Sequence, residues 1–172
     1  GGDTEASRDL FAMDTYMTVT AYGKGATEAV DQAADEISRL DQLLSTGNED
    51  SEIYKINQSG DGILSEETAY LVERSLDLYE ATDGAFDIAI YPVMKVWGFT
   101  DDNFRVPDAD ELKDLLTLTD ASDISYDKET SQIVFKKDGM QIDFGGIAKG
   151  YTSARIMDIF RACGIKSGLV NL

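Results

Sequence analysis

The chain places a strand-like segment directly before a long amphipathic segment, and this order restricts the folds open to it. Between Phe11 and Tyr22, apolar and polar residues alternate, which is typical of a strand with one buried face. From about Thr27 to Leu44, apolar residues recur at steps of three and four, which predicts a helix with one apolar stripe. Each element has a single face to bury, so we expect helices packed on a sheet.

Helical patterns recur along the chain. A short helix is predicted after Ser51, a residue type suited to an N-cap, and a longer one from about Ser65 to Ala81. A short acidic helix is predicted from Asp108 to Leu116, and a final amphipathic helix from near Ile147.

Strand patterns occupy the region between the last two helices. Ile124 to Phe144 is predicted to be a meander, in which Asp138 and Gly139 form a two-residue hairpin turn. Ala85 to Phe99 has no clean period, and Pro92 excludes a central strand there, so we expect buried irregular chain leading into a short helix. The predicted class is therefore α+β, a mostly antiparallel sheet with packed helices, in one domain of 172 residues.

The two ends differ in character. Residues 1–9 are small and polar, and we interpret them as a tether or an expression remnant ahead of the domain at 10–172. The run from Ser167 to Leu172 is apolar and resembles a strand that has just begun. Because the backbone of a buried strand needs partners, we expect the domain to be incomplete at its C-terminus.

Composition excludes several kinds of chemistry. The formal charge of −18 argues against nucleic acid or an anionic membrane surface as the main partner. The absence of histidine removes imidazole bases, Ser-His-Asp systems and His-ligated zinc. A metal would therefore have oxygen ligands, which points to magnesium or calcium. No apolar run approaches the roughly 20 residues that span a bilayer.

One segment suggests an anion site. Asp143 to Tyr151, read D-F-G-G-I-A-K-G-Y, ends a predicted strand with two glycines and opens a helix with Lys149 in its first turn. A cation there opposes the helix dipole, so a bound phosphate would explain it. The spacing is neither G-x-G-x-x-G nor a Walker A loop. A solvated Lys149, with Asp143 capping the helix, is equally compatible with the pattern.

Two further segments allow more than one interpretation. Asp87 lies among apolar residues, so its carboxylate either accepts hydrogen bonds from the backbone, which is favoured, or receives a donor from a ligand. Met13 and Asp14 at the front of a strand are unremarkable by themselves. Trp97 and Phe99 could cover a flat ring, although aromatic residues at this density more often belong to a core.

Together, these segments resemble the ApbE family of flavin transferases. The resemblance rests on Met13-Asp14-Thr15-Tyr16, on Ala85-Phe86-Asp87 followed by Pro92 and Trp97-Gly98-Phe99, and on Asp143 to Tyr151. The order and spacing of the three blocks match the family from about Phe11 to Leu172, and the last block is the most specific.

The resemblance implies a fold and an activity. The fold would be ApbE-like (T-fold-like), with this chain forming the N-terminal portion of one flavin transferase domain. The activity would be magnesium-dependent transfer of FMN from FAD to a threonine hydroxyl of a partner redox protein, with release of AMP. An FAD pyrophosphatase that yields FMN and AMP is the alternative enzyme, and a flavin-binding module without catalysis is the alternative outside enzymes.

Site residues are carried over by position from the family. The resemblance implies that Met13, Asp143, Lys149 and the stretch Ala85, Phe86 and Asp87 contact FAD, and that Gly146 offers a backbone carbonyl to magnesium. No catalytic residue is assigned, because the family's remaining metal ligands and its candidate base lie in a later segment. We therefore expect this chain alone to be inactive.

Two other expectations follow from the family. Its members often carry an aromatic residue after the Ser-Thr of the loop that follows the first helix, where this chain has Gly47. They are usually lipid-anchored on the extracytoplasmic face of the cytoplasmic membrane, where redox-complex subunits accept FMN. We expect the same cell-envelope location here, through an anchor that this chain does not contain.

Overall fold

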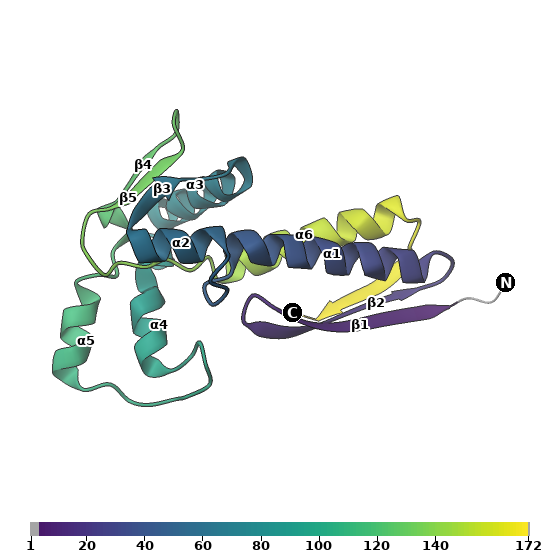
Figure 1. Cartoon of the computed structure of the whole chain (residues 1–172), viewed down its shortest axis with the longest axis horizontal. Helices are drawn as coiled ribbons and strands as arrows, with labels where there is room; N and C mark the ends of the chain where they lie inside the picture. Colours follow the sequence, from purple (N-terminus) through teal and green to yellow (C-terminus); the bar gives the residue numbers. More distant parts are fainter. Residues whose placement is uncertain (1–3, 172) are drawn as a thin grey trace.

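A β-hairpin opens the fold in the computed structural model, which describes residues 4–171 (Figure 1). Strands β1 (Glu5–Ala12) and β2 (Thr15–Tyr22) pair antiparallel, and β6 (Ser167–Asn171) pairs antiparallel with the other edge of β2. The alternation in β2 sends Met17, Val19 and Ala21 into the interior, where each is at most 2% exposed.

Two long helices cover the inner face of this sheet. α1 (Ala26–Leu44) and α6 (Gly146–Ala162) lie side by side along the long axis of the molecule (Figure 1). The apolar stripe predicted for α1 is buried, and α6 adds Ile156 and Phe160 to the same core.

A second antiparallel sheet, in the order β3-β5-β4, lies beyond the far end of α1. It is formed by β3 (Asp61–Ile63), β4 (Ile124–Asp127) and β5 (Gln132–Phe135). Helices α2 (Glu52–Ser59) and α3 (Glu66–Ala81) pack with it around a second core. As predicted, Ser51 caps α2, and its hydroxyl accepts the amide of Tyr54 at 2.9 Å.

The segment between α3 and β4 is mostly short helices. A 3₁₀ turn (Ile88–Ile90) leads into α4 (Tyr91–Trp97), and α5 (Ala109–Leu116) and a second 3₁₀ turn (Ala121–Asp123) follow. The expectation of irregular chain leading into a short helix is confirmed. The α+β class is confirmed as well, with the strands divided between two sheets.

The predicted hairpin at Asp138 and Gly139 is wrong, because Met140 to Phe144 is extended but does not form a strand of either sheet. Its backbone bonds to other partners: Ile142 exchanges two hydrogen bonds with the side chain of Asn57, at 2.8 and 2.9 Å. Met140, Ile142 and Phe144 are each at most 1% exposed. The alternation of apolar and polar residues from Met140 to Phe144 therefore indicates an extended backbone with one buried face. It does not indicate pairing with another strand.

The tether predicted for residues 1–9 is also wrong over residues 5–9, which form the first part of β1. Residues 1–3 lie outside the described residues. The polar character of this stretch comes from its position on an edge strand, where most of its side chains are exposed. Within residues 4–171, no helix is both long enough and apolar enough to cross a membrane.

Candidate functional site

A cleft of about 520 Å³ lies where the β1–β2 turn, the loop after α1, α4 and the start of α6 meet. Its walls combine aromatic, apolar and acidic side chains with one lysine. Residues that the argument below uses are Phe11, Met13, Asp14, Tyr16, Thr46, Tyr91, Phe99, Asp143, Gly145, Gly146 and Lys149. The volume is within the range of small-molecule sites.

The β1–β2 turn forms one wall of the cleft. Met13 and Asp14 are its two central residues, with φ angles of 51° and 62°. Two successive left-handed residues match the right-handed twist of a hairpin, although neither is glycine. A contact with α1 stabilises the turn, because the amide of Met13 donates to Oδ1 of Asp41 at 2.6 Å. Asp41 also accepts the side-chain amide of Asn48 at 2.7 Å, so it joins the turn to the loop after α1.

Asp14 is fixed over that loop. Its Oδ2 accepts the hydroxyl of Thr46 at 3.0 Å. A Cβ atom on Gly47 would overlap the Asp14 carboxylate, so glycine at this position leaves room for it. The carboxylate of Asp14 therefore lies where a side chain at position 47 would have to pass.

The opposite wall is the start of α6. Gly145 precedes the helix with φ 54° and ψ −124°, a conformation that suits glycine and turns the chain sharply after Asp143. Lys149 follows in the first turn, where its amide donates to the carbonyl of Gly145 at 3.3 Å, and its side chain is exposed. A helix of 17 residues thus begins at the cleft, and the positive end of its dipole lies at the cavity, where it favours an anion.

Asp143 is the electrostatic centre of the cleft. Burial raises the pKa of its carboxyl group, the charge of Asp14 raises it further, and Lys149 acts in the opposite direction. Its carboxylate has one long contact, from the Gly145 amide at 3.4 Å. The side chain is therefore anchored weakly and remains available to a ligand or cation.

Asp87 has a different environment. Its Oδ1 accepts the amide of Ala89 at 2.8 Å, and its Oδ2 accepts the amide of Ala121 at 3.0 Å. Both oxygens thus hold the backbone, as the favoured interpretation of the sequence stated. Burial still raises its pKa.

Four of the seven site residues predicted from the sequence meet in the cleft: Met13, Asp143, Gly146 and Lys149. Ala85, Phe86 and Asp87 are not among the lining residues, and Phe86 packs against the second core. This stretch lies behind the cleft, since the carbonyl of Ile88 accepts the amide of Asp143 at 2.9 Å. A contact between Ala85, Phe86 or Asp87 and FAD stays a prediction.

The sequence prediction did not assign Asp14, Thr46 or Tyr91 to the site. Asp14 was part of a quoted motif, but the alternation from Phe11 to Tyr22 was interpreted as one strand, so the turn at Met13 and Asp14 was missed. Thr46 is in the loop after α1. Tyr91 is buried beside them, and burial raises its pKa. No local pattern distinguished the last two from ordinary loop and core residues.

A charged network holds α6 in place behind the cleft. The Tyr151 hydroxyl donates to Glu67 on α3, and Arg39 on α1 donates to the same carboxylate at 2.6 and 3.1 Å. Arg39 also contacts Glu36 at 2.5 Å, and Arg155 lies 3.6 Å from Glu36. Burial and the bond to Glu67 raise the pKa of Tyr151 to about 12, so its hydroxyl remains a donor at neutral pH.

With this geometry established, the sequence can be compared with known proteins. Residues 13–172 match the ApbE family, and the chain belongs to that family. It is 31% identical over 180 aligned positions to an FAD:protein FMN transferase from Treponema pallidum, with 98% of this chain covered. Over 139 positions it is 30% identical to an FAD:protein FMN transferase from Klebsiella pneumoniae, with 79% of this chain and 44% of that protein covered.

Solved structures agree with the fold. The ApbE protein of Thermotoga maritima matches 98% of this chain with a TM-score of 0.83 and 27% identity. The apo form of the flavinyl transferase ApbE from Pseudomonas stutzeri matches 99% with a TM-score of 0.79 and 27% identity. This chain covers 56% of each of those two chains and 50% of the Treponema protein, so it spans about half the length of its relatives.

Proposed function

We propose that this chain forms the FAD-binding part of an FAD:protein FMN transferase. The whole protein would transfer FMN to a threonine hydroxyl of a redox-protein subunit and release AMP. The observation that carries the proposal is the cleft, in which Met13 lines the same cavity as Asp143, Gly146 and Lys149 from a segment far along the sequence. The relatives that carry this activity by name support it.

The cleft has features suited to a dinucleotide. Lys149 and the first turn of α6 would pair with pyrophosphate oxygens, since both present positive charge. Gly145 and Gly146 have no heavy atom within 4 Å of an added Cβ, which leaves space for close approach of a phosphate. The exposed rings of Phe11, Tyr16 and Phe99 offer aromatic surface at the edge of the same cavity.

The residues present fit one side of a magnesium site. Asp14 and Asp143 supply hard oxygen ligands, and the Gly146 carbonyl is the third candidate. Among residues 4–171, no three carboxylate, cysteine or histidine side chains are close enough to form a metal cluster. Magnesium often binds through one or two carboxylates together with water and substrate phosphates, and it would neutralise charge on the transferred phosphoryl group.

In the proposed reaction, the threonine oxygen forms a bond to the FMN phosphorus, and the bond from that phosphorus to the AMP oxygen breaks. Lys149 would hold the phosphates in line and stabilise negative charge on their oxygens. The threonine proton needs an acceptor, for which this chain offers no assigned residue. We therefore expect the 172-residue chain alone not to convert FAD to AMP.

The test compares the 172-residue chain with the whole protein. Each is incubated with FAD, Mg²⁺ and a protein that carries an acceptor threonine, and AMP, free FMN and covalently labelled acceptor are measured. Labelled acceptor from the whole protein supports the transferase, whereas free FMN without labelling supports the pyrophosphatase. Bound but unreacted FAD supports the non-catalytic module. AMP production by the 172-residue chain would contradict its expected inactivity.

The location is part of the same proposal. A transferase for redox subunits would act at the extracytoplasmic face of the cytoplasmic membrane, held there by a lipid anchor outside this chain. The net charge of −18 is consistent with an anchor rather than direct adhesion to anionic lipid. Fractionation of cells that express the whole protein, with and without its native N-terminus, would test the location.

A further inference from the structure

Asn57 is a buried polar residue of α2 whose side chain bonds to backbone far along the chain. It is 8% exposed. Its Nδ2 donates to the carbonyl of Ile142 at 2.9 Å, and its Oδ1 accepts the amide of Ile142 at 2.8 Å. The side chain thus takes the place of a neighbouring strand, because it satisfies both the donor and the acceptor of one residue in an extended segment.

This contact lies directly before residues of the cleft. Asp143 follows Ile142, and its amide donates to the carbonyl of Ile88 at 2.9 Å. Ile142 is fully buried, and successive side chains of an extended segment point to opposite sides, so the Asp143 side chain is directed to the cleft. The bonds at these two residues therefore set where the Asp143 carboxylate and the turn at Gly145 lie.

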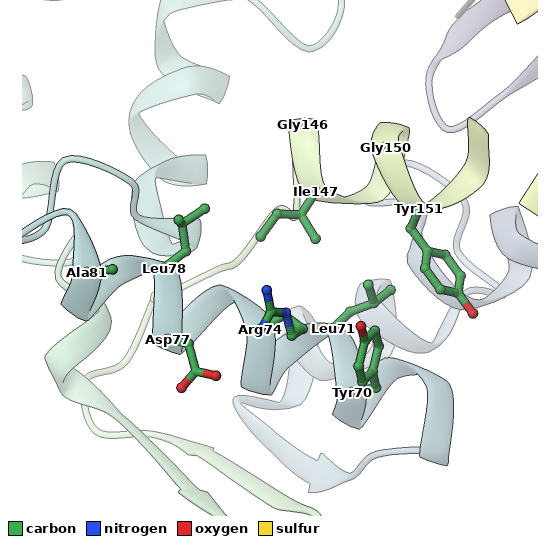
Figure 2. A pocket seen from close by; sticks show the side chains of 10 residues that line it. All are labelled: Tyr70, Leu71, Arg74, Asp77, Leu78, Ala81, Gly146, Ile147, Gly150 and Tyr151. Atoms are coloured by element: carbon green, nitrogen blue, oxygen red, sulfur yellow. The ribbon is translucent and has the colours of Figure 1, made fainter. Parts of the chain in front are cut away.

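The start of α6 is open on the side of α3. A groove of about 510 Å³ lies between α3 and the first two turns of α6 (Figure 2). Gly146 and Gly150 give this side of α6 no side chains, and a Cβ added to either would have no heavy atom within 4 Å. Gly146 lines both the groove and the cleft. Its position therefore depends more on the segment that precedes it than on packing against α3.

The same helix, α2, also contacts the other wall of the cleft. The hydroxyl of its N-cap, Ser51, donates to the carbonyl of Ser45, and both residues are at most 2% exposed. Ser45 precedes Thr46, whose hydroxyl donates to Asp14. The helix therefore connects the loop after α1, on one wall, with the segment before α6, on the other.

We propose that Asn57 is a positioning residue of the cleft. It fixes Asp143 and the first turn of α6 relative to the wall that carries Asp14. Asn57 is not among the described residues that line the cleft, so it acts through the backbone of Ile142 and not by contact with a ligand. The inference rests on the proposed function, because FAD is the ligand whose binding this placement would support.

The first test compares two variants of the whole protein that lose stability by different routes. Asn57→Leu keeps a similar size and shape but removes both hydrogen bonds to Ile142. Ile133→Ala, in β5, is the matched control, because Ile133 is buried in the second core and is not among the described residues that line the cleft. Both variants should lower the melting temperature by several degrees.

Only Asn57→Leu should change binding of FAD. Calorimetric titration, at a temperature where both variants are folded, should show affinity weakened about tenfold or more, because a site tolerates displacements of only about 0.5 Å. Ile133→Ala should bind FAD within about twofold of wild type. Unchanged affinity in folded Asn57→Leu would overturn the proposal, and so would an equal loss in Ile133→Ala.

Hydrogen exchange tests the contact without FAD. In the unliganded wild-type protein, the amide of Ile142 should exchange at least about a hundredfold more slowly than an unprotected amide. In Asn57→Leu, exchange across residues 142–146 should rise at least about tenfold more than exchange in β2. Fast exchange of Ile142 in the wild type, or equal rises in the variant, would overturn the proposal. If the wild-type protein binds no FAD, the proposed function fails, and hydrogen exchange still decides whether Asn57 holds this segment.

Discussion

Asp87 and Asp143 each belong to one of the sequence blocks that resemble the ApbE family, yet their carboxylates have different environments in the fold. Burial raises the pKa of both carboxyl groups. Asp87 offsets this cost with two backbone amides, at 2.8 and 3.0 Å, which tie the start of a 3₁₀ turn to Ala121. Asp143 has one contact at 3.4 Å and faces Asp14 and Lys149. An aspartate in a motif can thus either accept hydrogen bonds from the backbone or leave its carboxylate free for a ligand. The number of its hydrogen bonds distinguishes the two roles.

Replacing Asp87 and, separately, Asp143 with asparagine should give the largest difference in stability between two variants. Asp87→Asn keeps one acceptor but turns an NH₂ group towards a backbone amide, which should cost about 2 kcal/mol of unfolding free energy. The melting temperature should fall by roughly 4–8 °C. Asp143→Asn should cost about 0.5 kcal/mol or less, because little bonding is lost. Urea unfolding of both variants checks this, and equal losses would remove the distinction.

Substitution of Lys149 tests whether the cleft around Asp143 binds a ligand. Lys149→Met in the whole protein should weaken FAD binding about tenfold, since a charged contact to phosphate is lost. Stability should not fall, because a cation in the first turn opposes the helix dipole. Calorimetric titration with FAD measures the first effect, and thermal unfolding the second. Unchanged affinity would return Lys149 to the role of a solvated side chain. Lys166→Met, an exposed lysine beyond α6, is the matched control.

The pH dependence of stability should show the smallest effect. A carboxyl group whose pKa is raised by folding binds more protons in the native state, so its contribution is complete below the unfolded pKa of about 3.9. That contribution is lost as pH rises through the higher folded pKa. Asp143→Asn should therefore flatten the fall in stability above about pH 4, so its small deficit relative to wild type should shrink or reverse as the pH rises.

Asp14→Asn is the control for this measurement. It removes the like charge beside Asp143 but leaves the larger cause, burial, in place. The pKa of Asp143 should move down and stay above the ordinary range, as followed by carbon NMR of labelled aspartate. A complete return to the ordinary value would show that charge, and not burial, controls this carboxyl group.

Local patterns predicted the elements that carry strong periodicity. The stripe of α1, the cap at Ser51 and the antiparallel pair of β4 and β5 within the predicted meander follow from residues close in sequence. The β1–β2 turn was missed, because Met13 and Asp14 lack the glycine or asparagine that usually marks left-handed residues. Residues 140–144 were misassigned, because alternation reports burial of one face but does not identify the partner.

The sequence by itself determined the α+β class, most helices and the glycine-lysine start of α6, since these depend on neighbours within a few residues. Tertiary structure alone decided which motif residues share a cavity. It brought Met13 into one cleft with Lys149, and it joined Asp87 to Ala121. These outcomes depend on packing between segments more than 30 residues apart, where loop closure and burial outweigh local preference.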